Sequence, residues 1–188
     1  MLTDKQIRMF TLLDEQIQSC KDCDLYNGGR AKPYWDKESI WVIIGEAPGK
    51  DEVTNNSPFV GIAARHLWDV MTIHELERKF FLILNTTNCR PTDGRKNLKP
   101  NSVEISTCRK WIRKYLKVLR PQKILLLGSY ALDTILSESG IMELNATTIY
   151  SREFECDIVR SIHPSMCIYY GNKGKQMLYN SIKLFKEI

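Results

Sequence analysis

Three short polar stretches carry the side chains with which this sequence could do chemistry. They read GEAPG, NTTNCRP and SIHPS, and they hold Glu46, Asn85 and His163. A carboxylate can orient water, an amide can pair with a polar ring, and an imidazole can donate a hydrogen bond to developing negative charge. Each stretch follows an apolar run, and loops at the carboxyl ends of parallel strands meet at one edge of a sheet. We therefore expect the three loops to converge.

Four of the six cysteines have a spacing that suits metal ligation. Cys20 and Cys23 form a C-x-x-C pair in a loop, Cys89 follows an apolar run, and Cys108 lies near the start of a helix-like segment. Four thiolates suit either a tetrahedral zinc or a 4Fe–4S cluster, and the softness of sulfur does not separate the two. The alternative is that Cys89 and Cys108 are buried small apolar residues, as free cysteines often are.

The glycine-rich turn does not match a phosphate-binding loop. The chain has neither the G-x-G-x-x-G fingerprint nor the G-x-x-x-x-G-K-S/T loop at this position. Glu46 also places a carboxylate where a phosphate cradle needs backbone amides. A nucleotide-phosphate site is therefore not expected here.

The spacing of apolar residues predicts the elements that position these loops. Continuous apolar runs, typical of buried strands, read IWVIIG, FFLIL and KILLLG. Helical periodicity covers 3–19, where Thr3 and Gln6 have capping-box spacing, and then 61–71, 103–119, 129–136 and 174–188. After Gly140 a short hairpin and a last strand are expected.

Strands that alternate with helices predict an α/β fold. We expect a three-layer α/β/α arrangement around a central, mostly parallel sheet of about four strands. A length of 188 residues fits one domain, 1–188, with the cysteine-bearing loop near 20–32. The formal net charge of +5 mildly favours a polyanion, and no apolar run reaches the ~20 residues of a membrane span. No signal peptide is recognised, so a cytoplasmic monomer that does not enter membranes is expected.

Four motifs, in order, resemble those of the family 4 uracil-DNA glycosylases, the iron–sulfur type of bacteria and archaea. GEAPGKDEVTNNSPFVGIAARHL resembles the family pattern GEAPGxxEDxxGxPFVGxAGxxL, and LNTTNCRPTDGR resembles TNxxKCRPPxNR. LRPQKILLLGSYA is similar to lxPkxivxLGxxA, and HPSM resembles the closing HPS or HPA motif. The order and spacing hold from about Cys20 to Met166.

The resemblance implies a cofactor and an activity. The cofactor is a 4Fe–4S cluster rather than zinc, held by Cys20, Cys23, Cys89 and Cys108. The activity is DNA base-excision repair: the enzyme flips uracil out of DNA and hydrolyses its N-glycosidic bond, leaving an abasic site. Uracil-containing DNA is the expected partner.

The resemblance also implies roles for the loop residues. Phe59 would stack on the flipped base, Asn85 would donate to uracil O4 and accept from N3–H, and His163 would donate near O2. Glu46 and Glu52 are the carboxylates available to position water, with no assignment between them. Further substrate contacts are expected from four residues: Ala47, Gly49, Ser165 and Met166.

Several positions depart from the family pattern. Val53 stands where the family has Asp, Asn56 where it has Gly, and Ala64, Asn88 and Thr92 also differ. These changes keep two alternatives open. One is a catalytically silent DNA-binding or damage-sensing module of the same fold, and the other is a glycosylase for another deaminated base.

Overall fold

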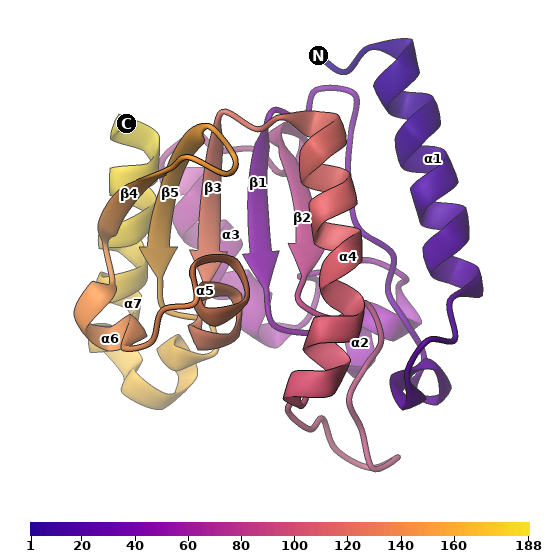
Figure 1. Cartoon of the computed structure of the whole chain (residues 1–188). Coiled ribbons are helices and arrows are strands. Elements are labelled where there is room, and N and C mark those ends of the chain that lie inside the picture. The colour runs from indigo at the N-terminus through magenta and orange to yellow at the C-terminus, as the bar shows by residue number, and fades with distance from the viewer.

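A five-stranded sheet forms the centre of the molecule, and the computed structural model describes all residues 1–188. The strand order is β2-β1-β3-β5-β4 (Figure 1). The strands are β1 (Trp41–Gly45), β2 (Phe81–Asn85), β3 (Lys123–Leu127), β4 (Thr147–Ser151) and β5 (Cys156–Ser161). All neighbouring pairs are parallel except β4 with β5. The predicted mostly parallel α/β sheet is confirmed, with five strands instead of about four.

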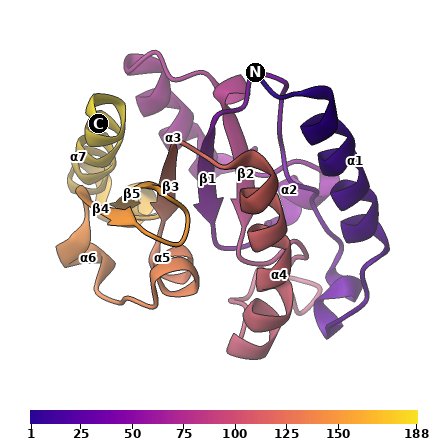
Figure 2. The same cartoon turned by 45° about the horizontal axis from the view of Figure 1, so that its top comes forward.

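Helices cover both faces of this sheet, which confirms the three layers (Figure 2). They are α1 (Asp4–Ser19), α2 (Lys50–Thr54), α3 (Ile62–Ile73), α4 (Ser102–Leu119), α5 (Ser129–Leu136), α6 (Ile141–Leu144) and α7 (Met166–Glu187), with 3₁₀ turns at Asp24–Gly28 and Arg78–Phe80. Alternate strand residues point to opposite faces. Ile44 therefore packs with α1, α4 and α5, whereas Ile43 packs with α3 and α7.

Two contacts attach α1 to α4 and to the loop that precedes β1. Thr3 and Gln6 form the predicted capping box at the start of α1. Further along α1, the Asp14 carboxylate accepts hydrogen bonds from the Tyr115 hydroxyl and from Trp35 Nε1, the latter at 3.1 Å. Burial raises the pKa of Asp14 above its usual range. The end of α1, where the first cysteines lie, is thus held on a fixed support.

The last helix, α7, begins with a bend. Gly171 has φ 52 and ψ −127 inside it, so the turn from Met166 to Tyr170 is set off from the long remainder. None of the helices combines the length and the apolar character that crossing a membrane requires.

Candidate active site and cysteine pocket

The carboxyl ends of four parallel strands bring the predicted loops together. Gly45 at the end of β1 pairs in register with Asn85 at the end of β2. Gly128 follows β3, and its N–H donates to the carbonyl of Ser161 at the end of β5 at 2.8 Å. In Figure 1 the arrows of these strands point to the same edge of the sheet. The expected convergence of the GEAPG, NTTNCRP and SIHPS loops is confirmed.

Phe59 and Asn85 meet over Gly45. A Cβ atom placed on Gly45 would lie 2.4 Å from Phe59 Cζ and 2.7 Å from Asn85 Oδ1, so only glycine leaves room for both side chains. Phe59 is 8% exposed and Asn85 6% exposed. The neighbouring Thr86 hydroxyl is bonded to the Glu46 carbonyl, whereas the Asn85 amide has no hydrogen bond within the protein. A nearly buried amide without a partner is ready to pair with a ligand.

The backbone of Phe59 is held in an unusual conformation. Its φ of 53 lies in the left-handed region, which costs free energy for an aromatic residue. Its carbonyl accepts hydrogen bonds from Trp68 Nε1 at 3.0 Å and from Arg78 Nη1 at 3.2 Å. The same guanidinium donates to the Pro58 carbonyl at 2.7 Å and lies 4.3 Å from the centre of the Tyr34 ring. These donors fix the turn that presents the ring.

Sequence reasoning missed Arg78 and Trp68. Arg78 lies in the charged stretch ELERKF, which belongs to no recognised motif, and Trp68 looks like one apolar residue of an amphipathic helix. No signal in the sequence joins either residue to Phe59.

His163, like Asn85, lies near the ring of Phe59. Its ring centre is 6.2 Å from that of Phe59. The backbone N–H of Ser165 donates to His163 Nδ1 at 3.2 Å, and the Ser165 hydroxyl lies 2.8 Å from the same nitrogen. Because a backbone N–H can only donate, Nδ1 must be the acceptor, which assigns the ring proton to Nε2. Burial lowers the pKa of His163 to about 4, so the ring is neutral near pH 7.

Gly128 gives this histidine its place. A Cβ atom on Gly128 would lie 2.9 Å from His163 Cβ, and the glycine has φ +90. Any other residue at position 128 would be strained and would push the imidazole away. The glycine of the LLLG run is therefore part of the site.

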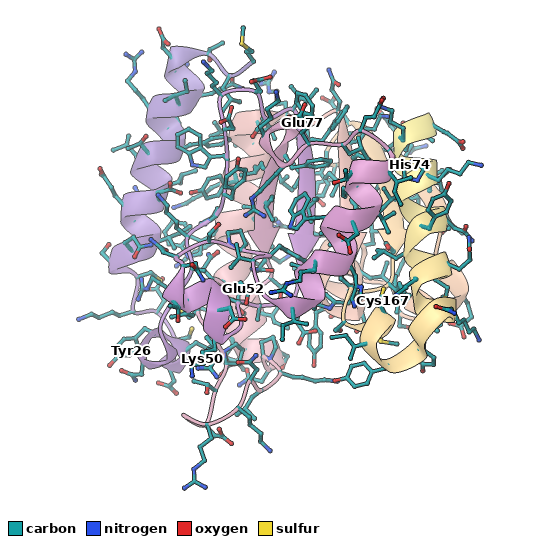
Figure 3. The ribbon with its side chains drawn as sticks, turned by 180° about the vertical axis from the view of Figure 1, so that it is seen from behind. Tyr26, Lys50, Glu52, His74, Glu77 and Cys167 are labelled. Atoms are coloured by element: carbon teal, nitrogen blue, oxygen red, sulfur yellow. The ribbon has the colours of Figure 1, made fainter.

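The two glutamates have different surroundings. The Glu52 carboxylate accepts backbone hydrogen bonds from Gly49 at 3.0 Å, Val60 at 3.0 Å and Gly61 at 2.7 Å. Glu52 belongs to α2, and its bonds to Val60 and Gly61 tie α2 to the start of α3 (Figure 3). Glu46 makes no such bonds; burial raises the pKa of its carboxyl, and Lys99 opposes that rise. Of the two, only Glu46 has a carboxylate free to act.

The remaining predicted contacts lie around the same edge. Ala47 and Gly49 are half-buried in the loop between β1 and α2, with Gly49 as the N-cap of α2. Ser165 and Met166 are half-buried at the start of α7. These four residues thus lie in the loops at the carboxyl edge of the sheet, and their roles toward a substrate stay predictions.

Two of the departures from the family pattern, Val53 and Asn56, face the cysteine-bearing loop. Val53 Cγ1 would lie 2.6 Å from a Cβ atom on Gly29. Asn56 has φ 46, a region that asparagine tolerates better than most residues, and its Oδ1 accepts from Lys32 N–H at 3.0 Å. Both substituted residues thus contact the segment between the first cysteine pair and β1.

The four cysteines of the predicted set line one apolar pocket. Cys20 caps α1, Cys23 precedes the 3₁₀ turn, Cys89 follows β2 and Cys108 lies on α4. Arg30 supports this loop: it donates to the Cys20 carbonyl at 2.9 Å and forms a backbone bridge with Cys89. No three His, Cys, Asp or Glu side chains are drawn together as a ready site for a metal ion. The pocket therefore has the donors and the enclosure of a metal centre without closed coordination geometry.

The inner two thiols of this pocket are strongly affected by burial. Desolvation raises the pKa of Cys89 to about 11 and that of Cys108 to about 12, and the neighbouring cysteines add to the rise. Asn88 counteracts this at Cys108, because its N–H and its Nδ2 lie 3.4 and 3.6 Å from the sulfur. A cation would be needed to keep these sulfurs deprotonated near pH 7.

Comparison with known proteins identifies the family. Residues 33–186 match the family model described as the Uracil DNA glycosylase superfamily. The chain is similar to a type-4 uracil-DNA glycosylase of Archaeoglobus fulgidus, with 32% identity over 82% of this chain and 80% of the relative. It is also similar to the type-4 uracil-DNA glycosylase of Sulfurisphaera tokodaii, with 28% identity over 94% of this chain and 83% of the relative. The chain therefore belongs to the uracil DNA glycosylase superfamily, among the type-4 proteins.

Proposed function

We propose that this chain is a uracil-DNA glycosylase that removes uracil from DNA by hydrolysing the N-glycosidic bond. The observation that carries the proposal is that an unpaired amide and a neutral imidazole both lie near one aromatic ring, at the carboxyl ends of the parallel strands. These groups belong to Asn85, Phe59 and His163. The names of the type-4 relatives support the same activity.

Asn85 and Phe59 account for the choice of base. The flipped base would lie against the Phe59 ring, where the Asn85 amide donates to O4 and accepts from N3–H. Cytosine presents an amino group and an unprotonated N3 at these positions, so it would leave the buried amide mismatched. Mismatched buried polar groups discriminate by orders of magnitude in rate.

His163 and Glu46 account for bond cleavage. As the bond between C1′ and N1 breaks, negative charge develops on uracil O2, and the Nε2–H of neutral His163 would donate to it. The sugar becomes electron-poor, and the Glu46 carboxylate would orient the water whose oxygen forms the new bond to C1′. The departing base takes up a proton and the water loses one, so the reaction is balanced. Glu52 would act by fixing the loop.

A 4Fe–4S cluster would be held by Cys20, Cys23, Cys89 and Cys108. The four sulfurs are a suitable donor set, and the apolar pocket encloses them. When bound, the cluster would supply cross-linking between α1, the loop near 20–32, the end of β2 and α4. This loop and the sheet would form a single domain, 1–188.

We further propose that the protein works as a monomer in the cytoplasm. All six cysteines are free thiols, which suits a reducing compartment. Ser165 and Met166 would contact the DNA strand beside the flipped nucleotide, with Ala47 and Gly49 at the mouth of the pocket.

An excision assay tests the proposal. Purified protein is incubated with a labelled oligonucleotide that carries one uracil, and the product is treated with alkali. Strand cleavage is expected, with a loss of roughly 100-fold or more in Asn85→Ala and His163→Ala. No cleavage by the wild type on uracil would overturn the proposal; cleavage only at another deaminated base would identify the alternative glycosylase, and binding without cleavage would identify a sensing module.

A further inference from the structure

Three large apolar side chains are exposed in succession just beyond the SIHPS loop that carries His163. Ile168 is 54% exposed, Tyr169 78% and Tyr170 48%. They follow Met166 in the first turn of α7, and Ile168 N–H donates to the Ser165 carbonyl at 3.0 Å. Removing exposed apolar side chains from water is favourable. Three of them in succession therefore mark a binding surface. The aromatic turn, defined as residues 166–170, is therefore a candidate surface.

The backbone holds this turn in a fixed position. Gly171 bends the chain in the left-handed region, and the turn folds back on the rest of α7. At Gly174 a Cβ atom would lie 2.6 Å from the Met166 carbonyl oxygen and 3.0 Å from Cys167 Cα. Figure 3 shows Cys167 in this bent start of α7. The tyrosines are thus carried on a supported turn at the same edge of the sheet as His163.

The charge around the turn favours a polyanion. From Ile158 to Lys186 the sequence contains no aspartate or glutamate. The exposed Lys173 and Lys175 lie on the next turn of α7, and Lys175 is near enough to Cys167 to affect its pKa. An aromatic pair followed by cations, in a stretch of chain without acids, suits single-stranded nucleic acid, with bases on the rings and phosphates on the lysines.

We propose that Tyr169 and Tyr170 stack on unpaired bases next to the target nucleotide, so that the protein binds single-stranded DNA more tightly than duplex. The inference rests on the proposed function for the identity of the nucleic acid. In a duplex the faces of the bases are covered by their neighbours, so exposed rings find partners only where a strand is unpaired. Each tyrosine is expected to contribute roughly a tenfold gain in affinity.

Binding measured without uracil tests this inference separately from catalysis. Fluorescence anisotropy is recorded with a labelled single strand of thymidines and with a matched duplex, for the wild type, the double variant Tyr169→Ala/Tyr170→Ala and Tyr169→Phe/Tyr170→Phe. The control is Tyr150→Ala, because Tyr150 is 59% exposed on β4 and pairs with Asp157 at the opposite end of β5. The alanine pair should weaken single-strand binding about 30- to 100-fold and duplex binding less than threefold, while the phenylalanine pair and the control bind normally.

Equal affinity of the wild type for both DNA forms, a larger loss on the duplex, or an equal loss in Tyr150→Ala would overturn the inference. The excision assay is run on the same proteins. Uracil removal by a wild type whose binding does not depend on the tyrosines would refute only this inference. Tyrosine-dependent binding by a protein that removes no uracil would refute only the proposed function.

Discussion

At the scale of single residues, the two glutamates after β1 differ in what their carboxylates already do. The Glu52 carboxylate accepts hydrogen bonds from three backbone N–H groups, whereas the half-buried Glu46 carboxylate accepts none of this kind. We predict that Glu46→Gln lowers kcat about 100-fold with little change in melting temperature. Glu52→Gln should instead lower the free energy of unfolding by about 1–3 kcal/mol and keep kcat within about tenfold, because it loses charge-assisted bonds that hold the loop. Single-turnover excision and thermal melts of both variants check this; the opposite pattern would assign the water to Glu52.

The raised pKa of Glu46 predicts the pH dependence of excision. Burial raises the pKa of Glu46 above its usual range, and catalysis needs the ionised form. Activity should therefore fall as pH drops through this raised pKa, and the fall should begin at a higher pH than for an ordinary glutamate. His163, with a pKa of about 4, stays neutral over this range and contributes no ionisation near 6.5.

A change at Lys99 tests whether Glu46 is the group that produces the acid limb of the pH profile. The positive charge of Lys99 lowers the pKa of Glu46, so Lys99→Gln should move the acid limb of the kcat profile to higher pH. Arg95→Gln, on the same exposed loop, serves as the control for general loss of positive charge. A limb that does not move in Lys99→Gln, or that survives in Glu46→Gln, would contradict the assignment.

At the scale of elements, the turn that carries Phe59 depends on a helix and a loop that the motifs do not include. Arg78 and Trp68 both donate to the Phe59 carbonyl, and Arg78 also donates to that of Pro58. Arg78→Met keeps the length of the side chain and removes its donors, so the left-handed turn should relax and misplace the ring. We predict weaker inhibition by free uracil, by about tenfold, and a KM that rises more than kcat falls.

Inhibition by uracil separates ring placement from general instability. Arg113→Met is the matched control, since Arg113 is 55% exposed and pairs only with Glu153 at 3.4 Å. Added guanidinium should partly restore uracil binding to Arg78→Met. If Arg78→Met binds uracil normally while its melting temperature falls, Arg78 only stabilises the fold.

The strands and turns also show which parts of the fold could be predicted from the sequence. The runs of β1, β2 and β3 are apolar at nearly every position because both faces are covered, and they were located directly. β4 is exposed along most of its length and has no continuous apolar run. The sequence therefore indicated only a short hairpin after Gly140, and the predicted count of about four strands was one too low. The residues of the proposed site could be predicted because their motifs are local in the chain. Arg78 donates to the Phe59 and Pro58 carbonyls, which lie about twenty positions earlier in the chain, so no local motif contains these bonds. The positive φ of Phe59 could not be predicted, because the residue is not a glycine.

At the scale of the whole molecule, the cysteine pocket joins parts of the chain that the sheet does not. α1 has its own attachments: Phe10, Leu13 and Ile17 are buried in the core, and Gln6 Nε2 donates to the Val118 carbonyl at 2.9 Å. The segment 20–32 buries little apolar surface beyond Leu25 and Ala31. Losing a bound metal group should therefore loosen this segment and leave the sheet intact.

Hydrogen exchange by mass spectrometry of the wild type and Cys20→Ala tests this division. We predict that Cys20→Ala loses the visible absorption of an iron–sulfur centre and melts roughly 5–10 °C lower, or about 2–4 kcal/mol for a chain of this size. Amides of Cys20–Lys32 should exchange faster, while those of β1, β2 and β3 keep their protection because their hydrogen bonds lie between two covered faces. Cys156→Ala should keep the absorption, since Cys156 is 3% exposed at the start of β5 and lies outside the cysteine pocket. Faster exchange throughout the sheet in Cys20→Ala would mean that the metal group supports the entire fold, and an absorption spectrum unchanged from the wild type would remove Cys20 from the ligand set.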